Sequence, residues 1–200
     1  SAYRDTTIRR RIERRMMLGG TADLAAYVER LRGERAELDA LYQDILINVT
    51  SFFRNYDSFE VLKTKVFPRL TEDRSKHEPV RFWVLGCSTG EEAYSLAMAF
   101  AEYSDISGRM IPIQIFATDL ADDSIIDKAR AGRYPQSIEG DVSSERLHRF
   151  FTKDGQSYCI NKSIRDRCVF SQHNITADPP FSRVDLISCR NVLIYMSPVL

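Results

Sequence analysis

The sequence predicts an α/β fold in which an all-helical N-terminal domain precedes a doubly wound, Rossmann-like sheet. Three observations lead to this prediction. Apolar residues recur at helical spacing over residues 1–75, short apolar strands alternate with helices from residue 80 onward, and a loop with two glycines joins the first of these strands to its helix.

The first 75 residues carry three apolar stripes with helical spacing. Their members are Leu24, Tyr27, Val28 and Leu31; Leu38, Leu41, Ile45 and Leu46; and Phe59, Leu62, Val66 and Leu70. Pro68 is expected to close the third helix. The polar segment 71–79 is typical of a connector, so we assign the helical domain and its linker to residues 1–75.

Residues 76–200 are expected to form the second domain. Buried strands are predicted at 80–85, 111–117 and 184–188, and helices at 91–103, 122–131 and 143–151. Segments 157–160 and 167–171 resemble a hairpin, with Cys159 and Cys168 facing each other, in a small β-subdomain at about 152–172. The chain stops shortly after a predicted core strand, so we expect it to be a piece of a longer protein.

The composition is that of an ordinary globular protein, with 44% hydrophobic and 28% charged residues. A net charge of zero argues against a nucleic-acid partner. We find no apolar run long enough for membrane insertion and no signal peptide. The four cysteines lack zinc-ligand spacing, so we expect no metal and reduced thiols in a cytoplasmic protein.

The loop from Gly86 to Glu92 is the most informative stretch. Its glycines permit a tight turn, with or without a ligand. It lacks the lysine of a phosphate-binding loop and carries Glu91 and Glu92 instead, which favours a cationic ligand. The same glutamates also suit the first turn of a helix. Asp119 follows the second strand, where it either binds ribose hydroxyls or caps a helix.

Four motifs then occur in order along the chain. They are Asn48-Val-Thr-Ser-Phe-Phe-Arg54, Gly86-Cys-Ser-Thr-Gly-Glu-Glu-Ala-Tyr-Ser95, Ala117-Thr-Asp119 and Cys189-Arg-Asn-Val-Leu-Ile-Tyr195. Together they resemble the CheR family of chemotaxis-receptor glutamate O-methyltransferases over almost the whole chain. Ala93 stands where that family usually has proline.

The resemblance implies S-adenosyl-L-methionine as cofactor and S-adenosyl-L-homocysteine as product. Arg54 and Tyr195 are implied to line the methyl-transfer site, and Asp119 to hold the ribose. The implied cofactor-binding residues are Asn48, Thr50, Arg54, Gly86, Glu91, Glu92, Asp119, Asn174, Ile175, Cys189 and Arg190. Without the resemblance, a buried aromatic residue with a satisfied hydroxyl would be the better explanation of Tyr195.

The implied reaction forms a methyl ester on a glutamate side chain of a receptor. A free glutamate has a pKa of about 4.3 and is already ionised at neutral pH, so no general base is required. The protein then acts mainly by alignment, which can contribute roughly 7–11 kcal/mol. Arg54 is suited to orienting the substrate carboxylate through paired donors.

Two alternatives to the receptor methyltransferase stay open. The chain can be a non-catalytic S-adenosylmethionine-binding module that senses or docks within a larger signalling protein, or it can methylate a small molecule or nucleic acid. Asp178-Pro-Pro-Phe181 resembles a DNA-methyltransferase tetrad, but it precedes a strand rather than following one, so a rigid turn is favoured.

Partner contacts are expected at the N-terminus. The resemblance implies that the helical domain meets the acidic methylation helices of chemoreceptor-like proteins. A basic run either makes that contact or forms a solvated helix face, and RNA binding is a weaker third alternative; its members are Arg9, Arg10, Arg11, Arg14 and Arg15. The insert 152–167 is short and holds the single Gly155, so we expect no strong binding of a receptor tail peptide.

Overall fold

The computed structural model describes residues 5–45, 50–121 and 123–192. Contacts divide the chain into two units, residues 1–49 with 191–200 and residues 50–190. Asn48 and Tyr195 lie outside the described residues. Within the described ranges, no helix is both long and apolar enough to cross a membrane.

Among its described residues, the smaller unit contains three helices, α1 (Asp5–Leu18), α2 (Leu24–Gly33) and α3 (Arg35–Ile45). Asp23 begins α2 by accepting a hydrogen bond from the backbone N–H of Ala26. Tyr27 and Leu41 are buried, but several other members of the predicted stripes are more than a third exposed, namely Leu24, Val28 and Leu38. The helical prediction is confirmed here, while the predicted stripes are only partly buried.

The larger unit begins with helical turns over residues 56–71. They comprise α4 (Tyr56–Val61), the π-helical turn η1 (Leu62–Val66) and α5 (Phe67–Thr71). The expectation that Pro68 closes this helix is wrong, because Pro68 lies in the first turn of α5, where its missing N–H is tolerated. The wider turn of η1 directly precedes it.

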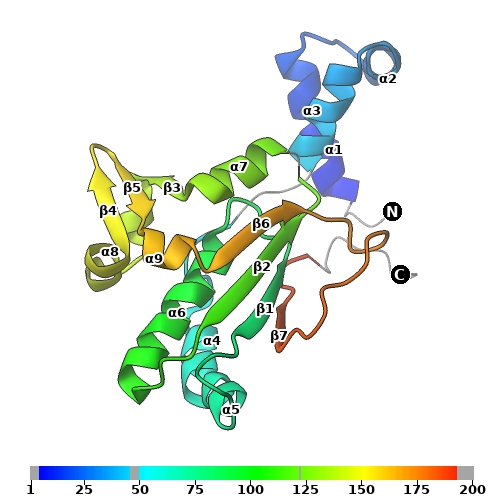
Figure 1. The fold of residues 1–200 in the computed structure, drawn as a ribbon. Coiled ribbons are helices and arrows are strands. Elements are labelled where there is room, and N and C mark those ends of the chain that lie inside the picture. Colours follow the sequence, from blue (N-terminus) through cyan, green and yellow to red (C-terminus); the bar gives the residue numbers. More distant parts are fainter. Residues whose placement is uncertain (1–4, 46–49, 122, 193–200) are drawn as a thin grey trace. The chain divides into compact units, whose positions relative to one another are not determined.

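In the part of the chain that the structure describes, the main sheet has four parallel strands. Their order is β6-β2-β1-β7 (Figure 1). They are β1 (Val80–Leu85), β2 (Ile113–Asp119), β6 (Cys168–Gln172) and β7 (Leu186–Ser188). Between them lie α6 (Glu91–Ser107), α7 (Asp123–Ala131), α8 (Ser144–Phe150) and α9 (Lys162–Arg165). The predicted α/β class is confirmed.

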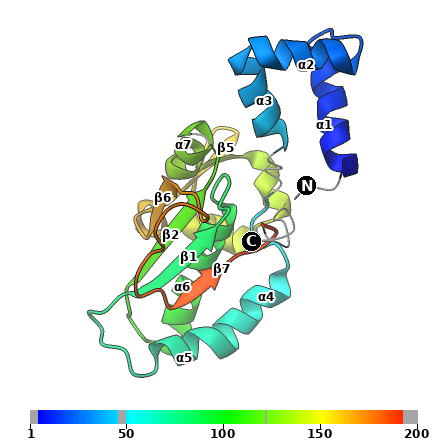
Figure 2. The ribbon, with the colours of Figure 1, turned by 90° about the vertical axis from the view of Figure 1, so that its right-hand side faces the viewer.

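Helix α6 and the helical turns before β1 pack on one face of this sheet (Figure 2). The opposite face carries Trp83 and Phe116, and Phe181 packs against both rings. The segment 178–181 therefore places Phe181 on the sheet, which agrees with a structural turn rather than a base-binding tetrad.

The second sheet is antiparallel, in the order β3-β5-β4. It comprises β3 (Arg133–Pro135), β4 (Phe151–Asp154) and β5 (Ser157–Ile160), and the 3-10 turn η2 (Gln136–Gly140) follows β3. The predicted hairpin of 157–160 with 167–171 is wrong, because β6 pairs with β2 in the main sheet. Cys159 and Cys168 accordingly lie in different sheets, as free thiols.

Candidate functional site

All four parallel strands of the main sheet end at the same edge. From β1 the sheet extends through β2 and β6 on one side and to β7 on the other. The direction of the strand order thus reverses at β1, and open α/β sheets bind ligands at such switch points. The residues after β1, β2, β6 and β7 are therefore the candidate site.

Backbone conformation shapes the loop after β1. Gly86, Ser88 and Gly90 have φ values of 68°, 48° and 98°. A Cβ on Gly90 would lie 3.2 Å from both the Ala129 Cβ and the Phe170 ring. Gly90 is thus required by its own conformation and by packing beneath the loop.

Asp119 ties the first two strand ends together. Its Oδ2 accepts a hydrogen bond from the Ser88 N–H at 2.7 Å, and its Oδ1 accepts from the Ala121 N–H at 2.9 Å. It lies four residues before Asp123, where α7 begins, so the contacts seen are with loops rather than with the first turn of that helix. Each carboxylate oxygen has a further lone pair for a ribose hydroxyl.

Glu91 and Glu92 begin α6 but occupy different environments. Glu91 accepts hydrogen bonds from the Thr89 hydroxyl at 2.7 and 2.9 Å, and burial raises the pKa of its carboxyl group. Glu92 accepts from Arg190 Nη1 at 2.9 and 3.2 Å and from Ser188 Oγ at 3.0 Å. Glu92 and Arg190 therefore place an anion and a cation side by side between β1 and β7.

Arg190 also contacts the first residues of the larger unit, which begins at Thr50. Its Nη2 donates to the Arg54 carbonyl oxygen at 2.6 Å. The Arg54 side chain is exposed, and Thr50 lies four residues earlier, half-buried. The structure thus brings Arg54, Glu92 and Arg190 together.

The remaining predicted residues follow the strands at the same edge. Asn174 comes after β6, and its Oδ1 accepts from both the N–H and the hydroxyl of Thr176. Its neighbour Ile175 is 37% exposed. Cys189 comes directly after β7 and is half-buried. Asn174 Oδ1 thus contacts its own loop rather than the Glu92–Arg190 pair.

Three contributors were missed in the sequence. Ser188 binds Glu92, Tyr134 donates its hydroxyl to the Thr89 carbonyl at 2.7 Å, and Ser95 accepts from the Phe53 N–H at 3.0 Å. Alternation along β7 places Ser188 on the sheet face that packs against α6. Its position in the strand could therefore have predicted a contact with that helix. No local pattern indicates the other two contacts.

Other ionisable groups near this edge suit packing better than catalysis. Burial raises the pKa of the Cys87 thiol well above its ordinary value, which leaves it neutral and unreactive. The His173 ring packs against both Trp83 and Phe181. The site therefore offers charge pairs for binding and no poised general base among the described residues.

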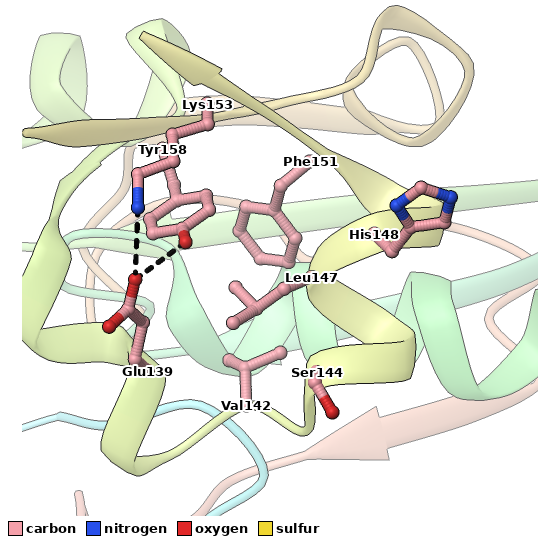
Figure 3. A pocket seen from close by; sticks show the side chains of 8 residues that line it. All are labelled: Glu139, Val142, Ser144, Leu147, His148, Phe151, Lys153 and Tyr158. Carbon is pink, nitrogen blue, oxygen red and sulfur yellow. Dashed lines mark hydrogen bonds and ion pairs between the residues drawn. The ribbon is translucent and has the colours of Figure 1, made fainter. Parts of the chain in front are cut away.

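A hollow lies beside the antiparallel sheet, between α8 and strands β4 and β5 (Figure 3). Its apolar wall includes Val142, Leu147 and Phe151. At its polar end, the Glu139 carboxylate accepts hydrogen bonds from the Tyr158 hydroxyl at 2.6 Å and from Lys153 Nζ at 3.4 Å. The polar groups of this hollow contact one another, and none of the predicted site residues lines it.

Comparison with known proteins gives consistent matches along the chain. Residues 48–199 match the model of the CheR methyltransferase SAM binding domain, and residues 1–46 match that of the CheR methyltransferase all-alpha domain. A chemotaxis protein methyltransferase of Listeria monocytogenes is 35% identical over 98% of this chain and 72% of its own length. Chemotaxis protein methyltransferase 1 of Pseudomonas aeruginosa is 34% identical over 94% of this chain and 70% of its own length.

A longer relative also matches. A 104.1 kDa protein of Rhodobacter capsulatus is 45% identical over 98% of this chain, which spans only 20% of that protein. The same pair of domains therefore occurs both in shorter methyltransferases and within a much longer chain.

Proposed function

Because the chain belongs to the CheR family of S-adenosylmethionine-dependent methyltransferases, we propose that it forms methyl esters on glutamate side chains of chemotaxis-type receptors. The names of the two chemotaxis protein methyltransferases support this substrate class. The observation that carries the proposal is the Glu92–Arg190 pair at the switch point of the sheet.

The charges at this edge fit the cofactor. An amino acid zwitterion needs an anion for its ammonium and a cation for its carboxylate, and Glu92 and Arg190 offer both within one pair. Asp119, at the end of the adjacent strand, keeps acceptor capacity for ribose hydroxyls. When bound, S-adenosylmethionine supplies a methyl group on a positively charged sulfur, which keeps the electron pair of the broken carbon–sulfur bond.

The protein's own contribution is then orientation and charge. A substrate glutamate is ionised at neutral pH, so its carboxylate oxygen is already the nucleophile and no proton has to be removed. We assign Arg54 the role of orienting that carboxylate, because its backbone carbonyl is held by Arg190 beside Glu92 while its side chain is exposed. Asn48, Thr50, Asn174, Ile175 and Cys189 remain proposed cofactor contacts, and Tyr195 a proposed neighbour of the methyl group.

Contact with acidic receptor helices is proposed for α1. Three of its arginines already have acidic partners within the helical unit: Arg9 with Glu13, Arg14 with Asp44, and Arg15 with Glu37. Arg9 and Arg14 stay more than half exposed, whereas Arg15 is 21% exposed. Arg9 and Arg14 are therefore better placed than Arg15 to meet a partner.

The first test is calorimetry with S-adenosylhomocysteine. The chain should bind it, and Glu92→Gln should weaken binding roughly 10- to 100-fold, because the anionic charge is lost and Arg190 loses its carboxylate partner. Glu78→Gln, at an exposed loop carboxylate, is the matched control and should bind normally. Equal affinity of the Glu92 variant and the control would refute the assignment of Glu92.

The second test is transfer of labelled methyl groups to receptor-rich membranes. A glutamate methyltransferase produces label that base hydrolysis releases. The non-catalytic alternative predicts cofactor binding without any label, and methylation of another acceptor predicts label that resists base. Base-stable label would contradict the proposed substrate.

A further inference from the structure

Arg54 is flanked by two residues in an unusual backbone conformation. Phe53 and Asn55 have φ values of 49° and 59°, in the left-handed region that non-glycine residues rarely adopt. For a bulky residue such as Phe53 this conformation is strained. Strained residues persist only where their surroundings hold them, and they concentrate at functional sites. The contacts that hold Phe53 therefore bear on the placement of Arg54.

The backbone of Phe53 is held by Ser95. The Phe53 N–H donates to Ser95 Oγ at 3.0 Å, and the Ser95 hydroxyl donates to the Glu91 carbonyl oxygen at 2.6 Å. Ser95 is fully buried. Its hydroxyl thus joins the segment that carries Arg54 to the first turn of α6, which carries Glu92.

The ring of Phe53 is held by Arg146 of α8. The Arg146 guanidinium lies 3.8 Å from the centre of the Phe53 ring, a cation–π contact. Two hydrogen bonds of 2.6 and 2.9 Å fix that guanidinium to the Glu102 carboxylate, which also accepts from Lys63 at 3.1 Å. Arg146 is therefore held in place over the ring.

The left-handed turn has a direct consequence at the site. It is followed at once by Arg54, whose carbonyl oxygen accepts from Arg190 Nη2, while Nη1 of the same guanidinium binds Glu92. A relaxed Phe53 would redirect the Arg54 carbonyl and release one of the contacts that orient Arg190. The strain at Phe53 is thus coupled to the charge pair through two hydrogen bonds.

We propose that Ser95 and Arg146 are positioning residues, which hold Phe53 in its left-handed conformation and thereby set Arg54 and Arg190 for cofactor binding and methyl transfer. The inference rests on the proposed function, since it assigns these contacts a role in that same site. Neither residue belongs to the charge pair itself, and both act through Phe53.

The chain offers matched controls for both residues. Ser104 also lies on α6, is buried, and donates its hydroxyl to a carbonyl one turn earlier, at 2.9 Å from the Phe100 oxygen. Arg149 also lies on α8, with its guanidinium 4.6 Å from the Phe150 ring and paired with Asp105. Ser104→Ala and Arg149→Lys therefore remove similar interactions at a distance from Phe53.

The experiment compares Ser95→Ala and Arg146→Lys with these controls in the full chain. Each variant is measured for S-adenosylhomocysteine affinity by calorimetry, for thermal unfolding, and for kcat and KM in methyl transfer. We expect Ser95→Ala and Arg146→Lys to weaken binding about 5- to 20-fold and to lower kcat, with an unfolding midpoint close to that of the matched control. Equal loss of affinity in the controls would overturn the proposal.

A double-substitution cycle separates positioning from general packing. If Ser95 acts through Arg190, Ser95→Ala should cost little further affinity in an Arg190→Ala background. Full additivity of the two losses would refute the coupling. If Ser95→Ala fails to fold, Arg146→Lys is combined with Arg190→Ala instead, and the same comparison of affinity losses tests the coupling. Failure of the unsubstituted chain to bind S-adenosylhomocysteine would instead refute the proposed function.

Discussion

The helical unit and the sheet unit are held together by different interactions. In the sheet unit, the rings of Phe67, Phe82 and Phe100 meet between sheet and helix with centroid distances of 5.2–5.9 Å, all fully buried. In the helical unit, Tyr27 and Leu41 are the buried apolar residues among its described side chains. Beside them, the buried Glu37 accepts two hydrogen bonds from Arg15 and one from Tyr27.

This contrast separates two sources of stability. Burial of aromatic surface depends on shape and volume and hardly on pH. A buried carboxylate depends on its partners and on staying ionised, and its removal leaves donors unpaired. The sheet unit should therefore respond most to lost volume, and the helical unit most to lost charge.

The largest effect is expected from Phe67→Ala in the sheet unit. Removing a fully buried ring should lower the free energy of unfolding by about 3–5 kcal/mol, because transfer energy is lost and a cavity remains. Trp83 is the single tryptophan and lies in this unit, so its fluorescence during urea unfolding measures the change.

Two controls test whether that loss stays local. Ile106→Ala, at a side chain that is 83% exposed, should leave the fluorescence transition almost unchanged. Hydrogen exchange of α2 amides should not accelerate in the Phe67 variant. Equal acceleration there would show that both units unfold as one, and the comparison would fail.

A smaller loss is expected from Glu37→Gln in the helical unit. The substitution weakens the hydrogen bonds from Arg15 and Tyr27 and should destabilise the three helices by roughly 1–3 kcal/mol. Hydrogen exchange of peptides from residues 5–45 measures this loss, while Trp83 fluorescence should not change. Glu29→Gln, at a carboxylate that is 71% exposed, is the control. If hydrogen exchange is equally fast in the two variants, the contacts of Glu37 with Arg15 and Tyr27 do not stabilise the helical unit.

The sequence predicted these units unequally. The strand Val80–Leu85 was predicted with its observed limits, because five of its six residues are apolar, with Arg81 as the exception. The hairpin prediction failed because β5 and β6 follow each other in sequence but pair with strands of different sheets. Short strands carry little information about their partners. The π-helical turn before Pro68 also could not be predicted from the sequence, since it depends on packing.

The site shows the same limit at the level of side chains. Motifs indicated Glu92 and Arg190 separately, but their pairing joins residues 98 positions apart. The bond from Phe53 to Ser95 spans 42 positions and serves a backbone conformation that propensity disfavours. Local pattern therefore predicts which elements carry the site, and tertiary contact decides how its residues are joined.

The smallest expected effect is the response to acid, and it distinguishes the helical unit from the sheet unit most directly. The hydrogen bond from Arg15, aided by Tyr27, holds the pKa of Glu37 below its ordinary value of 4.5, so its stabilisation is present above pH 4.5 and is lost as the pH falls through the lowered pKa. Burial raises the pKa of Glu91, so its charge costs stability above that raised pKa, and this cost disappears as the pH falls from the raised pKa to the ordinary value of a glutamate.

The two units should therefore respond in opposite directions when each glutamate is compared with its own glutamine variant. As the pH falls from 7 to 3, the free energy of unfolding of the parent should approach that of Glu37→Gln in the helical unit. In the sheet unit, the free energy of unfolding of the parent should rise relative to that of Glu91→Gln. Urea unfolding followed by amide NMR signals of each unit measures both differences at each pH, and charges shared by variant and parent cancel. If both stability differences change with pH in the same direction, the two carboxylates respond to the overall charge of the protein. The hydrogen bonds from Arg15 and Tyr27 would then not explain the acid response of the helical unit.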